Sequence, residues 1–561
     1  MQQIESMRAA RRGRPLFNFL RMLLAVSVGV LLGWLVVPRR EPPRDVLLIT
    51  VDTLRADALN AEDTPAMMEL AARGRIFTRA RSPVPLTLPA HASILSGLAP
   101  RQHGLRDNTA RPLAKRDQRD FDLLAEEFRD RGYVTAAFVA SAVLDPRYGL
   151  DAGFDVYRHP APPERGALIW NTLDASEQVT RFSQWFEARP ADRHWFAWIH
   201  LWDPHDPYRP YDGDRLRAGT AESDSAAERY RGELRRADAA LQAILERIDS
   251  ERTVVVLCAD HGESLGEHDE TTHGYLCYGA TMDVPLILAG PGIEAGEDSE
   301  PCTLEDLAPT LRTLCGLNSA PSDGRDLRDR DSDEGRADRV LAGESLYAYR
   351  LFVWAQQQVA FDGRYSLVDG GPDLHLFDRQ TDPGEIRPLA DPQAHPAFER
   401  LDRALMEYRR ADSRSEQGGA LTPYGTPYGS KRIAGNALLP VAENRSLPAV
   451  RERLGTVQLL DRFRGLVGMG HAGAVRAMLP DIQAAGLADP ANPALALHRG
   501  RALLLVLGEP QRAVEALERA RALGYDDPDV WGLLLRAYEQ AGDQVAARSI
   551  RALLAGKKLD R

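Results

Sequence analysis

The chain has 561 residues and a formal net charge of −11, with 44% hydrophobic and 27% charged residues. These proportions are typical of globular proteins, so they exclude a disordered chain and a polytopic membrane protein. At roughly 100–200 residues per domain the length predicts about two to four domains. The acidic balance argues against nucleic acid as a partner. Four cysteines without a CxxC pair exclude a disulfide scaffold and a multi-cysteine zinc module.

Near the N-terminus lies one apolar run, residues 17–37, with arginines on both sides. Roughly 20 apolar residues cross a bilayer, so this run is long enough to be a transmembrane anchor. A cleaved signal peptide would end in small residues, whereas this run ends in Val36-Val37-Pro38, which favours an uncleaved anchor. Residues 1–16 carry the larger number of arginines, which predicts a cytoplasmic N-terminus and a catalytic body on the periplasmic or extracellular side.

Two apolar stretches each end in an acidic residue. Residues 45–52 read DVLLITVD and residues 252–260 read RTVVVLCAD, the composition of buried parallel strands. Helical and strand patterns alternate between them, which predicts an α/β fold. Ligands of such sheets bind beyond the carboxyl ends of the strands. We therefore expect Asp52 and Asp260 to meet there, although 208 residues separate them.

The C-terminal part of the chain divides by composition. Residues 353–377 show strand patterns. Residues 413–430 are polar and rich in glycine and proline, which predicts a linker, expected over residues 413–449. Residues 450–561 show helical patterns, and turns around Gly508 and Gly542 lie 34 residues apart, the tetratricopeptide period. Two or three degenerate repeats are expected, with an unrelated helical bundle as the alternative.

Most chemistry-bearing residues fall in four short segments. These are VDTLRAD from Val51, TLPAHAS from Thr87 running on to Asn108, DPHDPY from Asp203, and DHGE from Asp260 with His273 beyond it. Carboxylates and imidazoles together suit a hard or borderline divalent metal. Taken alone, Thr87 reads as a helix N-cap and His205 as a turn histidine. The Asp260-His261 pair is more informative, because an adjacent acid and imidazole rarely tolerate burial without a cation.

Together, in this order, the four segments resemble the sulfatase-like branch of the alkaline phosphatase superfamily. The resemblance covers about residues 45–410, and its most specific parts are LLITVDTLRAD, TLPAHASILSGLAPRQHGLRDN, DPHDPY and DHGESLGEH. It implies a mixed, mostly parallel sheet between helices, with a small C-terminal β subdomain. The expected domains are a basic tail (1–16), an anchor (17–37), a stem (38–44), a catalytic domain (45–412), a linker (413–449) and tetratricopeptide-like repeats (450–561).

The resemblance implies a metal that activates a threonine nucleophile. Asp52, Asp260 and His261 take the positions of its ligands, and Thr87 takes the position of the nucleophile, which also contacts the metal. A threonine hydroxyl is unreactive at its ordinary pKa, so it needs such activation. Zinc is the expected ion given the histidine ligands, with Mn²⁺ or Ca²⁺ as alternatives and one or two ions per site.

The resemblance also assigns supporting residues. His91 takes the place of an arginine in the sulfatase signature. Asn108 stands where nucleotide-pyrophosphatase-like members carry an asparagine that steadies the transferring phosphoryl group. His205 and His273 are expected to bind a second metal or the substrate and to serve the leaving oxygen, and Asp203 is expected to join that second site.

Three departures from true sulfatases bear on the substrate. Sulfatases convert a cysteine or serine to formylglycine, a route closed to Thr87. Their signature arginine is replaced by His91, and residues 136–141 lack the lysine that sulfatases carry after the corresponding strand. These departures favour phosphoryl-type transfer, by a hydrolase such as a phosphodiesterase or by a transferase.

Two alternatives stay open at this stage. One is a sulfuric-ester hydrolase that uses unmodified threonine. The other is a catalytically weak envelope scaffold whose helical repeats bind a protein partner. In either enzyme the substrate would be a phospho- or sulfo-ester, and a membrane anchor makes an envelope lipid or glycan plausible.

Overall fold

The computed structural model describes residues 44–108, 112–161, 172–208, 225–318, 320–328, 339–412, 438–526 and 528–556. The expected tail and anchor, and all of the stem but Arg44, lie outside these residues. Within the described ranges, no helix combines the length and apolar character needed to cross a bilayer.

The centre of the molecule is an eight-stranded sheet. Its spatial order is β5 (Val156–Arg158), β4 (Val134–Phe138), β6 (Trp195–Leu201), β1 (Asp45–Val51), β7 (Thr253–Ala259), β8 (Leu286–Ala289), β2 (Arg75–Phe77) and β9 (Gly296–Asp298). From β5 to β7 all neighbours are parallel, whereas β8 runs antiparallel to both β7 and β2. The predicted α/β class with a mixed, mostly parallel sheet is confirmed.

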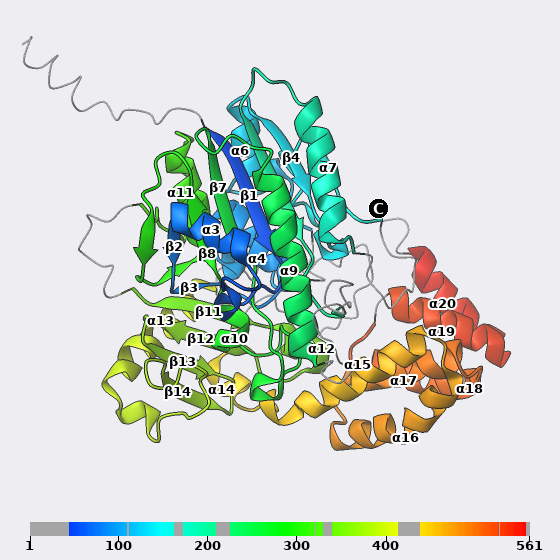
Figure 1. Ribbon diagram of the computed structural model, residues 1–561. Coiled ribbons are helices and arrows are strands. Elements are labelled where there is room, and N and C mark those ends of the chain that lie inside the picture. The colour runs from blue at the N-terminus through cyan, green and yellow to red at the C-terminus, as the bar shows by residue number, and fades with distance from the viewer. Residues whose placement is uncertain are drawn as a thin grey trace, which may run out of the picture. The chain divides into compact units, whose positions relative to one another are not determined.

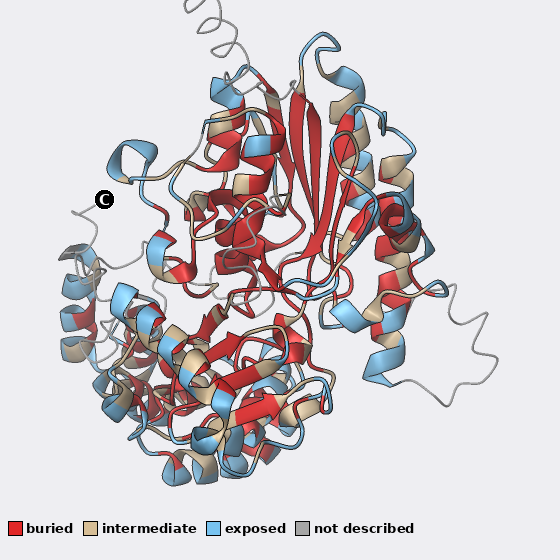
Figure 2. Cartoon of the chain, turned by 90° about the vertical axis from the view of Figure 1, so that its left-hand side faces the viewer, coloured by how far each residue is buried: buried red, intermediate tan, exposed pale blue. Residues whose placement is uncertain are grey.

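The three central strands are buried along their whole length, which explains their unbroken apolar sequences (Figure 2). Strand β1 pairs with β6 on one side and β7 on the other, so that Val51, Leu201 and Ala259 lie in register. The carboxyl ends of these strands therefore end at one edge of the sheet.

Helices cover both faces of this sheet (Figure 1). On one face α9 (Ala226–Leu245) packs between α3 (Pro65–Arg73) and α7 (Ala175–Ala188). On the other, α4 (Thr87–Ser96) packs against α6 (Leu124–Asp130) and α11 (Leu307–Leu314).

A second, antiparallel sheet follows in the chain. It has the order β11 (Leu341–Ser345), β12 (Gln357–Phe361), β13 (Tyr365–Asp369) and β14 (Leu374–Asp378), and α13 (Pro396–Asp412) packs on it. This sheet is the small C-terminal β subdomain that the resemblance implied. Between β11 and β12 lies the short helix α12 (Tyr347–Phe352), which faces the C-terminal helices described next.

The C-terminal part is helical, as predicted. After the short α14 (Val441–Asn444), six helices follow: α15 (Leu454–Gly468), α16 (Ala472–Ala488), α17 (Pro493–Leu505), α18 (Pro510–Ala522), α19 (Pro528–Ala541) and α20 (Gln544–Gly556). Each packs against the next. Their identity as tetratricopeptide repeats stays a prediction.

Hydrogen bonds join these helices to the β subdomain. The Trp354 indole N–H donates to Asp489 Oδ2 at 2.7 Å, and the Tyr525 hydroxyl donates to the Leu351 carbonyl at 2.8 Å. Asn444 exchanges two hydrogen bonds with the backbone of Gln356. Residues 438–449, expected to be part of a linker, are therefore docked through Asn444, while residues 413–437 lie outside the described chain.

We expect Asp489→Ala to weaken this junction. Asp489 is buried and accepts hydrogen bonds from the Trp354 indole and from Asn492 at 3.1 Å. Alanine leaves the buried indole donor without its acceptor, which costs about 1–3 kcal/mol of unfolding free energy. Urea unfolding measures this loss, with the exposed Asp481→Ala as the matched control. Equal stability of the two variants would contradict a role for this contact.

Stability is also expected to depend on pH through Glu305, just before α11. Burial raises the pKa of Glu305 from 4.5 to about 8, against the opposing hydrogen bond from the Thr303 hydroxyl. Because the folded pKa lies above the unfolded one, this group favours folding below about pH 4.5, and the contribution is lost as the pH rises to about 8.

The variant Glu305→Gln removes this titration. The unfolding free energy of the variant minus that of the parent chain should increase as the pH rises, by at most about 1.4 kcal/mol per pH unit. Urea unfolding on both sides of neutral pH measures the gain. The exposed Glu300→Gln should follow the parent chain at every pH. A pH-independent difference for Glu305→Gln would contradict the raised pKa.

Candidate active site

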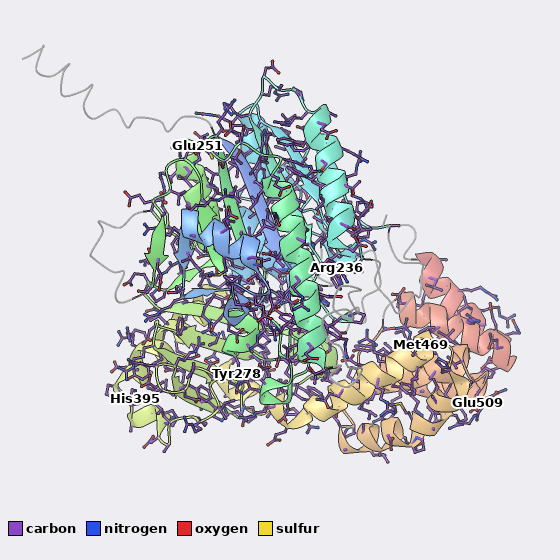
Figure 3. All side chains as sticks on the ribbon, viewed as in Figure 1. Arg236, Glu251, Tyr278, His395, Met469 and Glu509 are labelled. Carbon is purple, nitrogen blue, oxygen red and sulfur yellow. The ribbon has the colours of Figure 1, made fainter. Side chains whose placement is uncertain are left out.

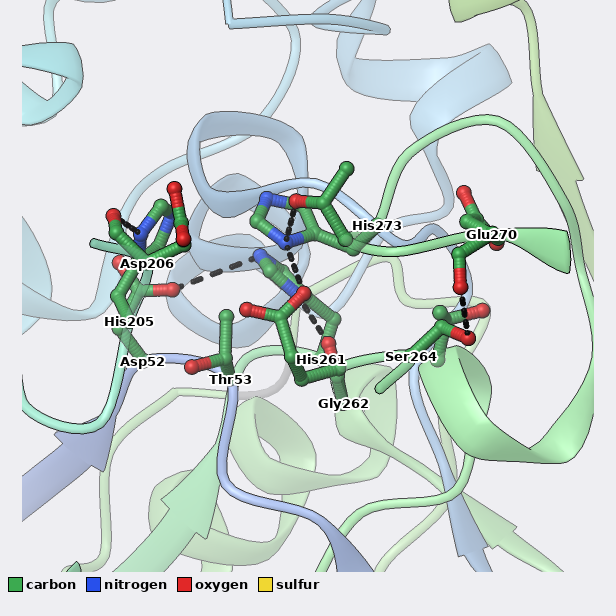
Figure 4. A network of polar contacts seen from close by, with 12 residues as sticks. Asp52, Thr53, His205, Asp206, His261, Gly262, Ser264, Glu270 and His273 are labelled. Carbon is green, nitrogen blue, oxygen red and sulfur yellow. Dashed lines mark hydrogen bonds and ion pairs between the residues drawn. The ribbon is translucent and has the colours of Figure 1, made fainter. Parts of the chain in front are cut away.

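Four of the residues singled out from the sequence meet at the carboxyl edge of the large sheet, and Figure 4 labels two of them, Asp52 and His261. Asp52 follows β1, Asp260 and His261 follow β7, and Thr87 is the first residue of α4. The Thr87 hydroxyl lies 3.3 Å from His261 Nε2, which is 3.6 Å from Asp52 Oδ1 and 3.5 Å from Asp260 Oδ2. All four side chains are almost completely buried.

The donor atoms of this cluster fit a divalent cation. His261 Nδ1 lies 2.9 Å from the Gly262 carbonyl, which can only accept, so the proton is on Nδ1 and Nε2 offers its lone pair. Both oxygens of Asp52 and Oδ2 of Asp260 are buried without a hydrogen-bond partner among the described residues. Burial raises the pKa of Asp52 to about 7. Buried, unpartnered carboxylate oxygens facing an imidazole lone pair are the environment that a bound cation stabilises.

His91 belongs to a hydrogen-bonded chain behind the nucleophile. Its Nδ1 lies 2.7 Å from the Thr87 carbonyl and therefore donates to it. Its Nε2 lies 2.8 Å from the Thr50 hydroxyl, which accepts from the Trp198 indole at 3.0 Å. Burial lowers the pKa of His91 to about 3, so the ring stays neutral. Although His91, His200 and Asp260 also place ligand-type atoms together, these bonds occupy both ring nitrogens of His91.

His200 was not predicted as a site residue, yet it contacts the metal-type cluster. It lies within β6, where the run FAWIHL is otherwise apolar. The Ala140 backbone N–H donates to its Nδ1 at 3.2 Å, so the ring proton is on Nε2, which lies 3.3 Å from Asp52 Oδ2. His200 Nε2 therefore faces Asp52 at close range without forming a hydrogen bond to it. The sequence signal that could have identified His200 is a histidine inside an otherwise apolar, buried strand.

His273 lies next to His261, and His205 lies next to His273. The His273 ring centroid is 4.3 Å from that of His261 and 5.0 Å from that of His205. His273 Nδ1 lies 3.0 Å from the buried carboxylate of Glu263, and His205 Nδ1 lies 2.5 Å from the Asp206 carbonyl. His205 thus holds its proton on Nδ1, because a carbonyl only accepts, and keeps Nε2 as an acceptor. His273 does the same when Glu263 is ionised, and burial raises the pKa of that carboxyl to about 8. Glu263, in the DHGE motif, is a second contact residue that the sequence reasoning left unassigned.

The two remaining candidates have other partners. Asp203 Oδ1 accepts from the Arg236 guanidinium at 2.7 Å, and its Oδ2 accepts from the Ala175 backbone N–H at 2.9 Å (Arg236 is labelled in Figure 3). Both oxygens are engaged, and these contacts tie Asp203 to α7 and α9; that Asp203 joins a second metal site stays a prediction. Asn108 Oδ1 accepts from the Leu88 backbone N–H at 2.9 Å, next to Thr87. The amide group of Asn108 adds two N–H donors.

Comparison with known proteins finds similar sequences and folds. Residues 44–317 match the sequence model described as Sulfatase. A Delta 4,5-hexuronate-2-O-sulfatase of Bacteroides thetaiotaomicron is 25% identical over 399 residues, which are 60% of this chain and 82% of that protein.

Solved structures share the fold. A 2-O GAG sulfatase matches with a TM-score of 0.55 at 21% identity, over 73% of this chain and 99% of its own. The phosphonate monoester hydrolase of Agrobacterium radiobacter matches with a TM-score of 0.50 at 21% identity, over 66% of this chain and 96% of its own.

The matched residues contain the strands that end at Asp52 and Asp260 and the helix that begins at Thr87. The sequence match and the shared fold therefore concern the same part of the molecule, the sheet that carries the buried cluster. Residues 44–317 thus match the Sulfatase model by sequence, and the chain shares its α/β fold with a solved sulfatase and a solved phosphonate monoester hydrolase.

Proposed function

We propose that this chain is a membrane-anchored, metal-dependent esterase that transfers the phosphoryl group of a phosphoric ester to Thr87 and then to water or an acceptor alcohol. The observation that carries the proposal is the Thr87 hydroxyl, 3.3 Å from His261 Nε2, beside two carboxylates with unpartnered oxygens. A vestigial scaffold gains nothing from keeping such oxygens buried, because each destabilises the fold when no cation is bound.

Asp52, Asp260 and His261 would hold the cation. When bound, it supplies Lewis-acid stabilisation of negative charge and lowers the pKa of a neighbouring hydroxyl. Zinc suits one imidazole and two carboxylates, and Mn²⁺ is the alternative that the same donors accept.

The chain's own groups favour attack by Thr87. The residue stands at the first position of α4, where the helix dipole favours negative charge. His91 holds the Thr87 carbonyl, and Asn108 holds the next backbone N–H, so both sides of the nucleophile are fixed. The Asn108 amide donors are suited to the equatorial oxygens of the transferring group.

His273 is suited to proton transfer at the leaving oxygen. Its Nδ1–H donates to Glu263, and this pairing stabilises the ring when Nε2 carries a second proton. In this first step Thr87 loses one proton and the leaving alcohol gains one, so the number of protons is unchanged. The His205 ring centroid lies 5.0 Å from that of His273, and its Nε2 offers a second acceptor for hydroxyl groups of the substrate.

A sulfuric-ester hydrolase is the second candidate, since the relative from Bacteroides thetaiotaomicron is named as a sulfatase. Position 87 offers no thiol or serine hydroxyl for conversion to formylglycine, so a sulfate ester would react with the threonine itself. For the residues outside the described ranges we retain the anchor at 17–37, with the catalytic domain on the outer side of the membrane. A protein partner on the helices of residues 450–561 is proposed on their stacked arrangement.

A substrate panel tests the proposal. The full chain in detergent is loaded with zinc, manganese or calcium and given an aryl phosphate, a phosphodiester, a phosphonate monoester and an aryl sulfate that share one leaving group. We expect kcat/KM to be highest for a phosphorus ester. Fastest turnover of the sulfate would support the second candidate, and no turnover together with no bound metal would support the scaffold.

A further inference from the structure

A hollow of about 200 Å³ lies at the opposite end of the large sheet, where β1, β6 and β7 begin. A water molecule occupies about 30 Å³ of the liquid, so the hollow has room for an ionic group with several waters. Strand β1 has seven residues at about 3.3 Å each, which separates this end from the catalytic edge by about 23 Å. Figure 3 labels Glu251 in the turn that leads into β7 at this end. The hollow is thus distinct from the candidate active site.

Arginine dominates the lining of this hollow. Arg189, Arg193, Arg247 and Arg252 line it together with the carboxylates of Asp45 and Asp249. Within the described part of the chain, none of the four guanidinium groups lies within 4 Å of a carboxylate oxygen, whereas Asp45 pairs with His194 at 3.0 Å. Asp249 accepts a backbone N–H from Glu251. Four positive groups without an ion-pair partner are unusual on a chain whose net charge is −11.

Three of these arginines are held in place by neutral groups. Arg189 stacks on the Phe186 ring, with its guanidinium carbon 3.5 Å from the ring centroid. Arg193 donates twice to the Gly132 carbonyl, at 3.0 and 2.6 Å, and Arg247 donates to the Ala243 carbonyl at 2.6 Å. These contacts fix the side chains without neutralising them, and the two carboxylates of the hollow, Asp45 and Asp249, balance only part of the four positive charges. A guanidinium has five N–H donors, so most of them stay available for an anion.

We propose that this arginine hollow binds a phosphate group. Planar guanidinium forks match phosphate oxygens in pairs, and several such groups around one hollow give a charge-assisted site. A phosphate suits the hollow better than a carboxylate does. A carboxylate has two oxygens and engages one guanidinium group, whereas a phosphate engages two or three. The proposal concerns binding away from the catalytic cluster and does not depend on which ester is hydrolysed.

Two sources can present this phosphate: the headgroup of an anionic phospholipid and a free phosphate. The first follows from the anchor proposed above. Seven residues, 38–44, connect the apolar run to the start of β1, and a chain of that length spans at most about 25 Å. The hollow, which begins at Asp45, would then lie within reach of lipid phosphates, where it would orient the catalytic domain on the membrane.

Binding of short-chain phosphatidylglycerol to the full chain in neutral detergent tests the proposal. We expect the double variant Arg247→Glu/Arg252→Glu to weaken binding at least about tenfold, because two charge-assisted contacts are lost. The matched control Arg403→Glu/Arg551→Glu makes the same charge change at exposed sites elsewhere and should bind like the parent chain. Short-chain phosphatidylcholine serves as the zwitterionic probe.

The outcomes separate the sources and the null result. Selective loss of phosphatidylglycerol binding in the hollow variant supports the lipid headgroup. Binding of inorganic phosphate is measured on the same variants. If the hollow variant loses only this binding, the result supports free phosphate as the ligand. Equal binding by all variants, or equal loss in the control variant, overturns the proposal.

Two further measurements keep the test independent of folding and of catalysis. The single exposed variant Arg252→Gln removes one charge without reversing it, and we expect a loss of about threefold where the double variant is unstable. Ester hydrolysis by the hollow variants should match that of the parent chain, because no catalytic group is touched. Absence of hydrolysis in every chain would reject the proposed function and leave the binding result intact.

Discussion

Replacing Thr87 by alanine should lower kcat at least about 10⁴-fold, because the substitution removes the only hydroxyl that contacts His261 Nε2 in the described site. The side chain is buried at the first turn of α4, whose N-cap is Leu86 and not Thr87, so alanine removes no helix cap. We expect the unfolding free energy to change by about 1 kcal/mol or less and metal binding to persist. Initial rates on the best ester of the panel, with urea unfolding of the same preparation, measure both quantities.

Two companion variants sharpen this result. Thr87→Ser keeps a hydroxyl and should retain measurable turnover. Thr78→Ala removes an exposed threonine elsewhere and should leave kcat unchanged. Acid quenching of the working enzyme, followed by peptide mass spectrometry, should find phosphate on Thr87. Retained turnover by Thr87→Ala would reject the threonine as nucleophile, and sulfate on Thr87 would favour the sulfuric-ester candidate.

Replacing Asp260 by asparagine should abolish metal binding. Asp260 Oδ1 already accepts the backbone N–H groups of Thr53 and His261, at 3.3 and 2.9 Å, and asparagine preserves these bonds. Its Oδ2 is the buried oxygen without a partner, and the substitution replaces this oxygen by an amide that cannot ligate a cation. We expect kcat to fall at least about 10³-fold together with the metal content.

The metal content is measured directly by elemental analysis after dialysis against zinc. In the parent chain, metal at 100 times its Kd should raise the unfolding free energy by about 2.7 kcal/mol, and a chelator should reverse this gain. Asp260→Asn should show no such gain. Asp57→Asn, in the same segment as Asp52 but with an exposed carboxylate paired to Arg55, is the matched control and should bind metal normally. A parent chain that takes up no divalent metal would contradict the site.

Most of the fold and the centre of the candidate site could be predicted from local sequence. Buried parallel strands need apolar side chains on both faces, so DVLLITVD and RTVVVLCAD were recognisable without a structure. The acids that end them had to meet, because parallel strands end at one edge. The contact partners of other site residues could not be predicted from the sequence. Asp203 belongs to a motif rich in ligand-type residues, but its charge is neutralised by Arg236, 33 residues away on α9. His200 looked like part of a strand, and only the backbone N–H of Ala140 decides which of its nitrogens faces Asp52.

The sequence by itself determined the class of this protein. Three features sufficed: the composition of the strands, the order of the four polar segments and the residue at position 87. All three can be read from the sequence without a structure. The tertiary structure alone decided which lone pairs are free, which carboxylates are already paired, and where four arginines gather with no carboxylate oxygen within 4 Å among the described residues. Each of these depends on groups from separate segments, such as Trp354 and Asp489 or Arg189 and Arg252. A hydrogen bond or an ion pair has two ends, and the pattern around one end does not identify the other.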